Sequence, residues 1–216
     1  EIIGDIELTQ QPFQTWTFGY SSSKNIENVT AEFMELMEEN SGEFDKIYII
    51  SHSLGGLIVQ KALHDSYNLD YNYVSKVKRA ILIGSPNEGS VFVNAYETLY
   101  RLLINKASKY KNIFNVNSEF IDNLKYGMIV PRVPEIEYYV IAGTNPFELG
   151  KISELKEIDE LHDGIVTVES AQRIGDSYVN DRCSNYWDIY LTHTQLIDDD
   201  LGRKLIERII AKDVLD

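Results

Sequence analysis

Ser53 stands where a short apolar run gives way to a glycine-rich stretch, a place where a serine can become reactive. Residues 46–50 are largely apolar and β-branched, which is typical of an interior strand of a parallel sheet. Gly55 and Gly56 then open a stretch with the apolar spacing of a helix. A serine on such a bend presents its hydroxyl clear of the backbone, and the N–H groups at the helix start point into the same space. The pattern predicts a nucleophile for acyl transfer, with a plain helix cap as the alternative from this stretch alone.

A serine hydroxyl needs a base to take its proton, so the four histidines are the candidates. His52 adjoins the serine, and its side chain is expected to point away from it. His64 lies on the predicted helix after the bend, and His162 lies in a loop beside an acid. His193 directly follows a predicted strand, at the edge where catalytic groups of open α/β sheets gather. His193 is therefore the predicted base.

The base in turn needs a carboxylate that fixes its tautomer and stabilises its protonated form. Asp163 is the predicted acid, because Gly164 allows a tight turn that aims the carboxylate inward. The chain order of the three groups is then serine, aspartate and histidine. Four further aspartates are alternatives: Asp159, Asp176, Asp181 and Asp188.

Strand-like and helix-like patterns alternate along the chain. Predicted strands cover residues 15–20, 46–51, 79–84, 137–143 and 186–192, and predicted helices cover 28–39, 201–212 and the stretch that opens at Gly55. Strands separated by helices predict an α/β protein with an open, mainly parallel sheet and helices on both faces. The length of 216 residues and the 44% hydrophobic content predict a single folded domain over residues 1–216.

The alternation breaks between Ser90 and Pro134. Residues 91–107 and 118–126 predict two helices that follow a strand end, where the loops of such sheets carry function. We expect a helical insertion over residues 90–134 that acts as a lid or cap over the site and lines an apolar pocket. Two packing helices without a special role are the alternative.

The charge balance excludes one class of partner. The chain has 20 Lys and Arg against 34 Asp and Glu, a formal net charge of −14. A surface of this sign repels nucleic-acid phosphates, so no nucleic acid is expected as a partner. Cys183 is the only cysteine, which rules out an intrachain disulfide and favours a reducing compartment, the cytoplasm. No apolar run reaches transmembrane length, and the first residues do not resemble a signal peptide.

Four segments of the chain, in order, resemble the α/β-hydrolase lipases and esterases. They are SHSLGG at 51–56, ILIGSPNEGS at 81–90, DGIVTVESA at 163–171 and LTH at 191–193. Bacterial triacylglycerol lipases and the serine esterases related to GPI inositol-deacylases carry G-T-P-H-x-G-S at the second segment and D-G-x-V-x-x-x-S-A at the third. The likeness spans nearly the whole chain, and the four motifs together are far more specific than the first alone.

This resemblance implies an α/β-hydrolase fold and the hydrolysis of carboxylic esters, with an acyl ester or a lipid as the substrate. It assigns Ser53 as the nucleophile, Asp163 as the acid and His193 as the base, and it places the backbone N–H of Leu54 in the oxyanion hole. An acyltransferase with the same triad, and a non-catalytic or gated effector domain of a larger protein, are the alternatives. No cofactor is expected.

The chain departs from the family pattern at several positions. Ser51 replaces the first glycine of G-x-S-x-G, and it is small enough for the bend. Asn87 and Glu88 replace a His-Arg-like pair, which puts a negative charge near the rim of the site. Gln195 stands where calcium-dependent bacterial lipases have an aspartate. The acidic run 198–200 is interpreted as a solvated helix start, so no metal is expected.

The front of the chain lacks one expected strand. Members of this fold have an earlier strand ending in His-Gly, whose loop supplies the second oxyanion-hole N–H, and nothing before Thr15 resembles it. In the family's sheet that strand lies between the strands expected here at 15–20 and 46–51. We therefore expect a sequence truncated at its N-terminus, and an upstream domain or partner chain that completes the sheet and the oxyanion hole.

Overall fold

The computed structural model describes residues 14–21, 23–90, 122–123, 125–146, 160–180 and 184–211. The two helices expected in the insertion lie largely outside these residues. Within 118–126, residues 122–123 and 125–126 are described and are helical. The lid or cap over residues 90–134 stays a prediction.

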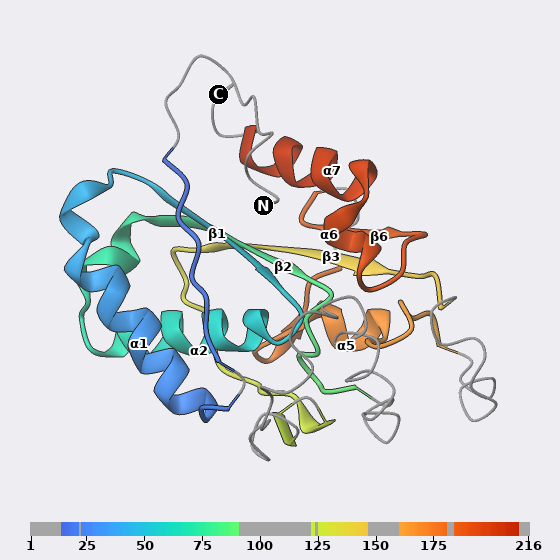
Figure 1. Cartoon of the computed structure of the whole chain (residues 1–216), viewed down its shortest axis with the longest axis horizontal. Helices are drawn as coiled ribbons and strands as arrows, with labels where there is room; N and C mark the ends of the chain where they lie inside the picture. The colour runs from blue at the N-terminus through green and yellow to red at the C-terminus, as the bar shows by residue number, and fades with distance from the viewer. Residues whose placement is uncertain are drawn as a thin grey trace.

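Four parallel strands form the central sheet (Figure 1). They are β1 (Ile47–His52), β2 (Val77–Ile83), β3 (Glu137–Gly143) and β6 (Tyr186–Ile189), in the order β1-β2-β3-β6. Four of the five strands expected from the sequence, and the parallel sheet, are confirmed here. β6 ends three residues earlier than predicted, because the chain turns there and the N–H of Leu191 donates to the carbonyl of Ile189 at 2.7 Å.

The strand predicted over residues 15–20 is wrong, because the described residues 14–21 have no regular secondary structure. A strand needs a neighbour to pair with, and in the described part of the sheet β1 pairs with β2 alone. Side chains tie this stretch to the domain instead. The Phe18 ring meets the Phe33 ring edge-on at 5.2 Å between centroids, and Trp16 meets Phe44 in the same way.

Helices cover both faces of the sheet, as the sequence predicts (Figure 1). The longer ones are α1 (Ile26–Glu39), α2 (Gly55–Asn68) and α7 (Asp200–Ala211), and the shorter ones are α5 (Val168–Gln172) and α6 (Gln195–Asp198). α1, α2 and α5 lie on one face, and α6 and α7 lie on the other. α1 begins two residues before its predicted start, because the side chain of Asn25 accepts the N–H of Asn28 at 2.8 Å and caps the helix there.

The structure also contains several short elements that the sequence patterns did not predict. They are the 3-10 helices η1 (Ser41–Glu43) and η2 (Asn72–Lys76) and the antiparallel pair β4 (Arg173–Ile174) and β5 (Ser177–Tyr178). Each is too short to show a hydrophobic period.

The sheet is buried on both faces, and β2 shows how. Ala80 and Leu82 point into the layer that α1 and α2 cover, whereas Ile81 and Ile83 point into the layer that α6 and α7 cover. All four side chains are fully buried. This two-sided burial explains why β2 is continuously apolar from Ala80 to Ile83 instead of alternating.

The two ends of the insertion meet beside the sheet and form a neck, which we define as residues 87–89 and 125–128. The Asn87 carbonyl accepts the N–H of Met128 at 3.0 Å. Gly89 and Gly127 both have positive φ, 85° and 70°, and a Cβ on either would collide with the backbone of the opposite end. Only glycine allows the two backbones to approach this closely.

Arg79 fastens α7 to the sheet. Its side chain is buried in β2, and its Nη1 donates to the carbonyl of Ile209 at 2.5 Å, in the last turn of α7. Its Nε donates to the Glu137 carboxylate at 2.8 Å. The guanidinium also lies over the Tyr139 ring, 5.5 Å from its centroid. One cation thus satisfies a helix C-terminus and a carboxylate together.

We predict that Arg79→Met lowers the free energy of unfolding by about 2 kcal/mol, because the carbonyls at the end of α7 lose their buried donor. Urea unfolding measures the loss. Arg203→Met is the matched control, since Arg203 pairs with the exposed Asp200 and should change stability by less than about 0.5 kcal/mol. Equal losses in the two variants would contradict the role of Arg79.

Candidate active site

Ser53 occupies a strained bend between β1 and α2. Its φ is +55°, a left-handed value that non-glycine residues seldom adopt. The bend is held by the Ser53 N–H, which donates to the Ile83 carbonyl at the end of β2 at 2.9 Å. The strand–turn–helix geometry predicted from residues 46–56 is therefore present. Backbone strain of this kind is often found at functional sites.

The start of α2 leaves a donor beside this bend. Gly56 N–H donates to the Ser53 carbonyl and Leu57 N–H to the Leu54 carbonyl, both at 3.0 Å. Among the described residues, the Leu54 N–H has no acceptor. An unsatisfied N–H at a helix start is a ready partner for an anion, which is the role predicted for Leu54.

Asp163 and His193 form a buried pair. His193 Nδ1 lies 2.7 Å from Asp163 Oδ2, and each residue is 1% exposed. The other carboxylate oxygen accepts the N–H groups of Ile165 at 2.9 Å and Val166 at 2.8 Å. The His193 N–H donates to the Asp163 carbonyl at 3.0 Å. Because a carboxylate accepts, Nδ1 carries a proton, and the neutral ring keeps its lone pair on Nε2, which can then act as a base.

Of the three residues predicted for the triad, the structure thus places two, His193 and Asp163, in direct contact. Ser53 Oγ makes no hydrogen bond with the His193 ring in this structure. The two are linked through His52, which precedes Ser53 and contacts His193. Catalytic hydrogen bonds are often long before substrate binds and shorten in the complex with substrate.

Two glycines make room for the buried pair, and sequence reasoning did not identify this role. A Cβ on Gly84, which has φ +53°, would lie 3.1 Å from His193 Nδ1 and 3.2 Å from Asp163 Oδ2. A Cβ on Gly143 would lie 2.6 Å from the Asp163 Cβ and 2.5 Å from the Leu191 carbonyl oxygen. The sequence did offer a signal for it, because β2 is followed by Gly84 and β3 ends at Gly143.

Asn87, one of the departures from the family pattern, is a buried connector. Its Oδ1 accepts the side-chain N–H of Gln60 on α2 at 2.7 Å, and its Nδ2 donates to the Ala171 carbonyl of α5 at 2.9 Å. Glu88 is exposed, and its carboxylate lies 3.7 Å from Arg173. Asn87 therefore ties the helix after the bend to the segment that follows Asp163.

The other three histidines, His52, His64 and His162, make contacts that differ from those of His193 in the described part of the chain. Burial, together with the neighbouring His193, lowers the pKa of His52 to about 3, so this ring is neutral at ordinary pH and a poor proton acceptor. His64 is hydrogen-bonded to Asn68 on α2. His162 Nδ1 accepts the N–H of Gly164 at 3.1 Å, and burial lowers its pKa.

Of the alternative acids, the structure describes Asp176 and Asp188. Asp176 is exposed in the turn between β4 and β5, and Asp188 lies on β6. Asp159 and Asp181 lie outside the described residues. Gln195, at the position of the lipase calcium ligand, accepts the N–H of Thr192 through its side chain. In the described ranges no group of three or more His, Cys, Asp or Glu could hold a metal ion.

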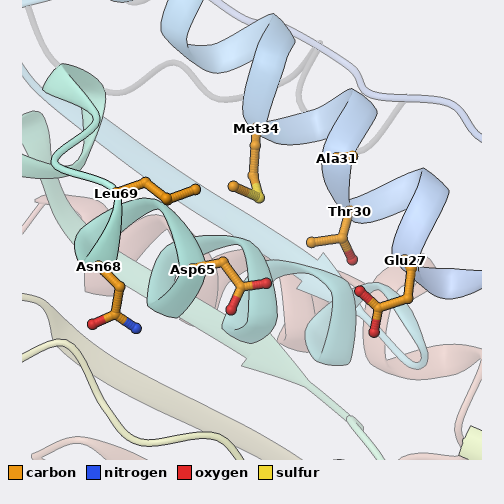
Figure 2. A pocket seen from close by; sticks show the side chains of 7 residues that line it. All are labelled: Glu27, Thr30, Ala31, Met34, Asp65, Asn68 and Leu69. Carbon is orange, nitrogen blue, oxygen red and sulfur yellow. The ribbon is translucent and has the colours of Figure 1, made fainter.

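A shallow cavity of about 400 Å³ lies between α1 and α2, away from these residues (Figure 2). It is lined by Glu27, Thr30, Ala31, Met34, Asp65, Asn68 and Leu69. Lys61 lies 2.8 Å from the Asp65 carboxylate and 3.3 Å from that of Glu27, so the two charges in the cavity wall already have a counterion.

Known proteins share this arrangement of strands and helices. No family model matches the chain, and no curated protein matches its sequence. The mature lipase BlEst2 of Bacillus licheniformis matches with a TM-score of 0.54 and 19% identity, over 86% of this chain and 74% of its own. The metagenomic carboxyl esterase MGS0156 matches with a TM-score of 0.56 and 17% identity, over 89% of this chain and 62% of its own. This chain has the α/β-hydrolase fold.

The phospholipase PlaB from Legionella pneumophila shares the α/β-hydrolase fold as well, with a TM-score of 0.52 and 14% identity over 73% of this chain. This chain spans 36% of PlaB, so most of that protein has no counterpart here. Structural similarity at such low sequence identity establishes the fold. The activity has to be argued from the residues of the site. None of the helices in the described ranges has both the length and the apolar character needed to cross a membrane.

We predict that Gly84→Ala lowers the free energy of unfolding by about 2 kcal/mol, because its methyl group meets the buried pair and its φ is left-handed. Chemical denaturation provides the measurement. Gly42→Ala serves as the control, since a Cβ there meets nothing within 4 Å. If Gly84→Ala were as stable as the control, the space beside His193 and Asp163 would not be restricted as described.

Proposed function

We propose that this chain is a carboxylic-ester hydrolase that works through an acyl-enzyme intermediate on Ser53. The observation that carries the proposal is the buried pair of His193 and Asp163, 2.7 Å apart, at the edge of the sheet where β1 bends at Ser53. A strained serine, an imidazole with a free Nε2 and a buried carboxylate are the three groups that acyl transfer needs. The structural neighbours, a lipase, a phospholipase and a carboxyl esterase, carry out reactions of the same class.

In the proposed first half-reaction, Ser53 Oγ attacks the ester carbonyl carbon while His193 Nε2 takes the hydroxyl proton. The carbonyl oxygen becomes an oxyanion, which accepts the N–H of Leu54. Asp163 stabilises the imidazolium. The intermediate then expels the alcohol, which receives the proton from His193 and leaves an acyl ester on Ser53.

In the second half-reaction, His193 takes a proton from water, and the resulting hydroxide equivalent attacks the acyl carbon. A second oxyanion forms at the same place, and its collapse returns the proton to Ser53 and releases the acid. An alcohol in place of this water would make the protein an acyltransferase. We take water as the default acceptor and an acyl ester or lipid as the substrate.

A second oxyanion donor is still required, and we propose that it comes from a segment of the protein or a partner chain lying beside β1. Among the described strands β1 has a neighbour on one side, β2. We propose that other parts of a larger protein, or a partner chain, complete or gate the site. The single cysteine supports placing the protein in the cytoplasm.

We predict that a fluorophosphonate probe labels Ser53 and that Ser53→Ala abolishes labelling, because the probe reacts with an activated serine. Mass spectrometry of the labelled peptide measures the site. Ser85→Ala is the matched control, since the Ser85 hydroxyl is buried against Gly56 and should leave labelling intact. Label that persists in Ser53→Ala, or that moves to Ser85 or Ser90, would overturn the assignment.

We predict that His193→Ala and Asp163→Asn each lower kcat by on the order of 10⁴-fold, because the two residues act as a unit with Ser53. The double variant should lose little more than His193→Ala alone. Turnover of p-nitrophenyl acetate measures the losses, and Asp176→Asn, in an exposed turn, is the control that keeps normal activity. Near-normal activity in Asp163→Asn would move the search for the acid to Asp159 or Asp188.

A further inference from the structure

The loop that carries His193, residues 190–194, reaches back across the sheet. It follows β6, at one edge of the four described strands, whereas β1 and Ser53 lie at the other edge. On its way it passes the ends of β3 and β2. The Leu191 carbonyl lies against Gly143, and the Leu196 side chain just beyond the loop lies against Gly84. The loop therefore needs an attachment near β1 to hold His193 toward the bend.

His52 provides that attachment. It is the last residue of β1 and directly precedes Ser53. Its Nε2 lies 3.0 Å from the His193 carbonyl oxygen, and because a carbonyl can only accept, Nε2 carries the proton of this hydrogen bond. The two imidazole rings also touch, with centroids 4.6 Å apart and planes tilted by 42°. One residue of the bend thus contacts both the main chain and the ring of His193.

This contact leaves a single polar atom of His193 without a partner in the described residues. Its N–H donates to the Asp163 carbonyl, its Nδ1 donates to the Asp163 carboxylate, and its carbonyl accepts from His52. The remaining atom is Nε2, which the proposed reaction uses. Asp163 fixes one side of the residue, and His52 fixes the other.

We propose that His52 is a positioning residue, which holds the His193 imidazole in place relative to Ser53 through its Nε2–H; this inference rests on the proposed function. His52 transfers no proton in the reaction. Burial and the adjacent His193 lower its pKa to about 3, so it donates as a neutral ring and does not repel the imidazolium that forms at His193. The charged and titratable groups that act on it are His193 and Asp163.

The test separates the hydrogen bond from the bulk of the ring. In His52→Gln the amide N–H can reach the His193 carbonyl, whereas His52→Met has a similar length without a donor and His52→Phe keeps a ring without a donor. We expect the Met and Phe variants to lose at least about 10-fold in kcat for p-nitrophenyl acetate with KM changed less than about twofold. His52→Gln should retain kcat within about threefold. His64→Gln is the control, with normal activity.

A second readout does not depend on turnover. In the Ser53→Ala protein, NMR can follow the Nδ1–H proton of His193. We expect its exchange with water to be at least about 10-fold faster in His52→Met and His52→Phe and unchanged in His52→Gln. A purely structural role would lower the melting temperature of all three variants without separating Gln from the other two.

The outcomes are distinct. The proposal is overturned if the donorless variants match wild type in kcat and exchange, or if His52→Gln is as damaged as His52→Met. If wild type has no esterase activity and no probe labelling, the proposed function fails by itself, and the exchange measurement still decides whether His52 holds His193. Should one donorless variant fail to fold, the other supplies the comparison with His52→Gln.

Discussion

The Asp163 carboxylate is buried together with the His193 imidazole, and the rest of the site follows from satisfying both without water. A buried charge is costly unless hydrogen bonds surround it. Two backbone N–H groups, of Ile165 and Val166, satisfy one oxygen, and His193 satisfies the other. The Asp163 carboxylate is therefore oriented mainly by its own turn. The His193 ring is oriented by Asp163, and His52 contacts its other side.

This pair also dictates the shape of the sheet edge. The parallel strands bring their carboxyl ends to one edge, where polar groups meet. β2 and β3 reach that edge with Gly84 and Gly143, because any side chain there would occupy the space of the pair. Strain gathers at the same place, in the left-handed backbone of Ser53 and Gly84, while the residues of β2 that lead to it, Ala80 to Ile83, are apolar and fully buried. The hydrophobic core carries the stability that allows a strained, polar edge.

The sequence alone predicted the sheet, its long helices and the bend at Ser53, because each has a local pattern several residues long. Asp163 was preferred to four other aspartates because Gly164 allows a tight turn, and motif resemblance then supported its pairing with His193, which lies 30 residues away. The strand over 15–20 was wrong, because a strand requires a neighbour to pair with as well as apolar residues, and Trp16 and Tyr20 are exposed in this structure. The contact of His52 with His193 joins residues 141 positions apart, so no periodicity could have revealed it.

The neck at residues 87–89 and 125–128 joins the two points where the chain segment 90–124 leaves the domain and returns to it. Its two chain segments are held together by a backbone hydrogen bond and by the close approach of Gly89 and Gly127. The spacing of the two segments is therefore set by the neck and not by the length of the chain between them. Loop-closure entropy changes slowly with length once the ends are fixed, by about 0.6 kcal/mol for each doubling. Evolution, or an engineer, can therefore lengthen, shorten or exchange the enclosed segment as a cassette while the positions of Ser53, Asp163 and His193 are kept.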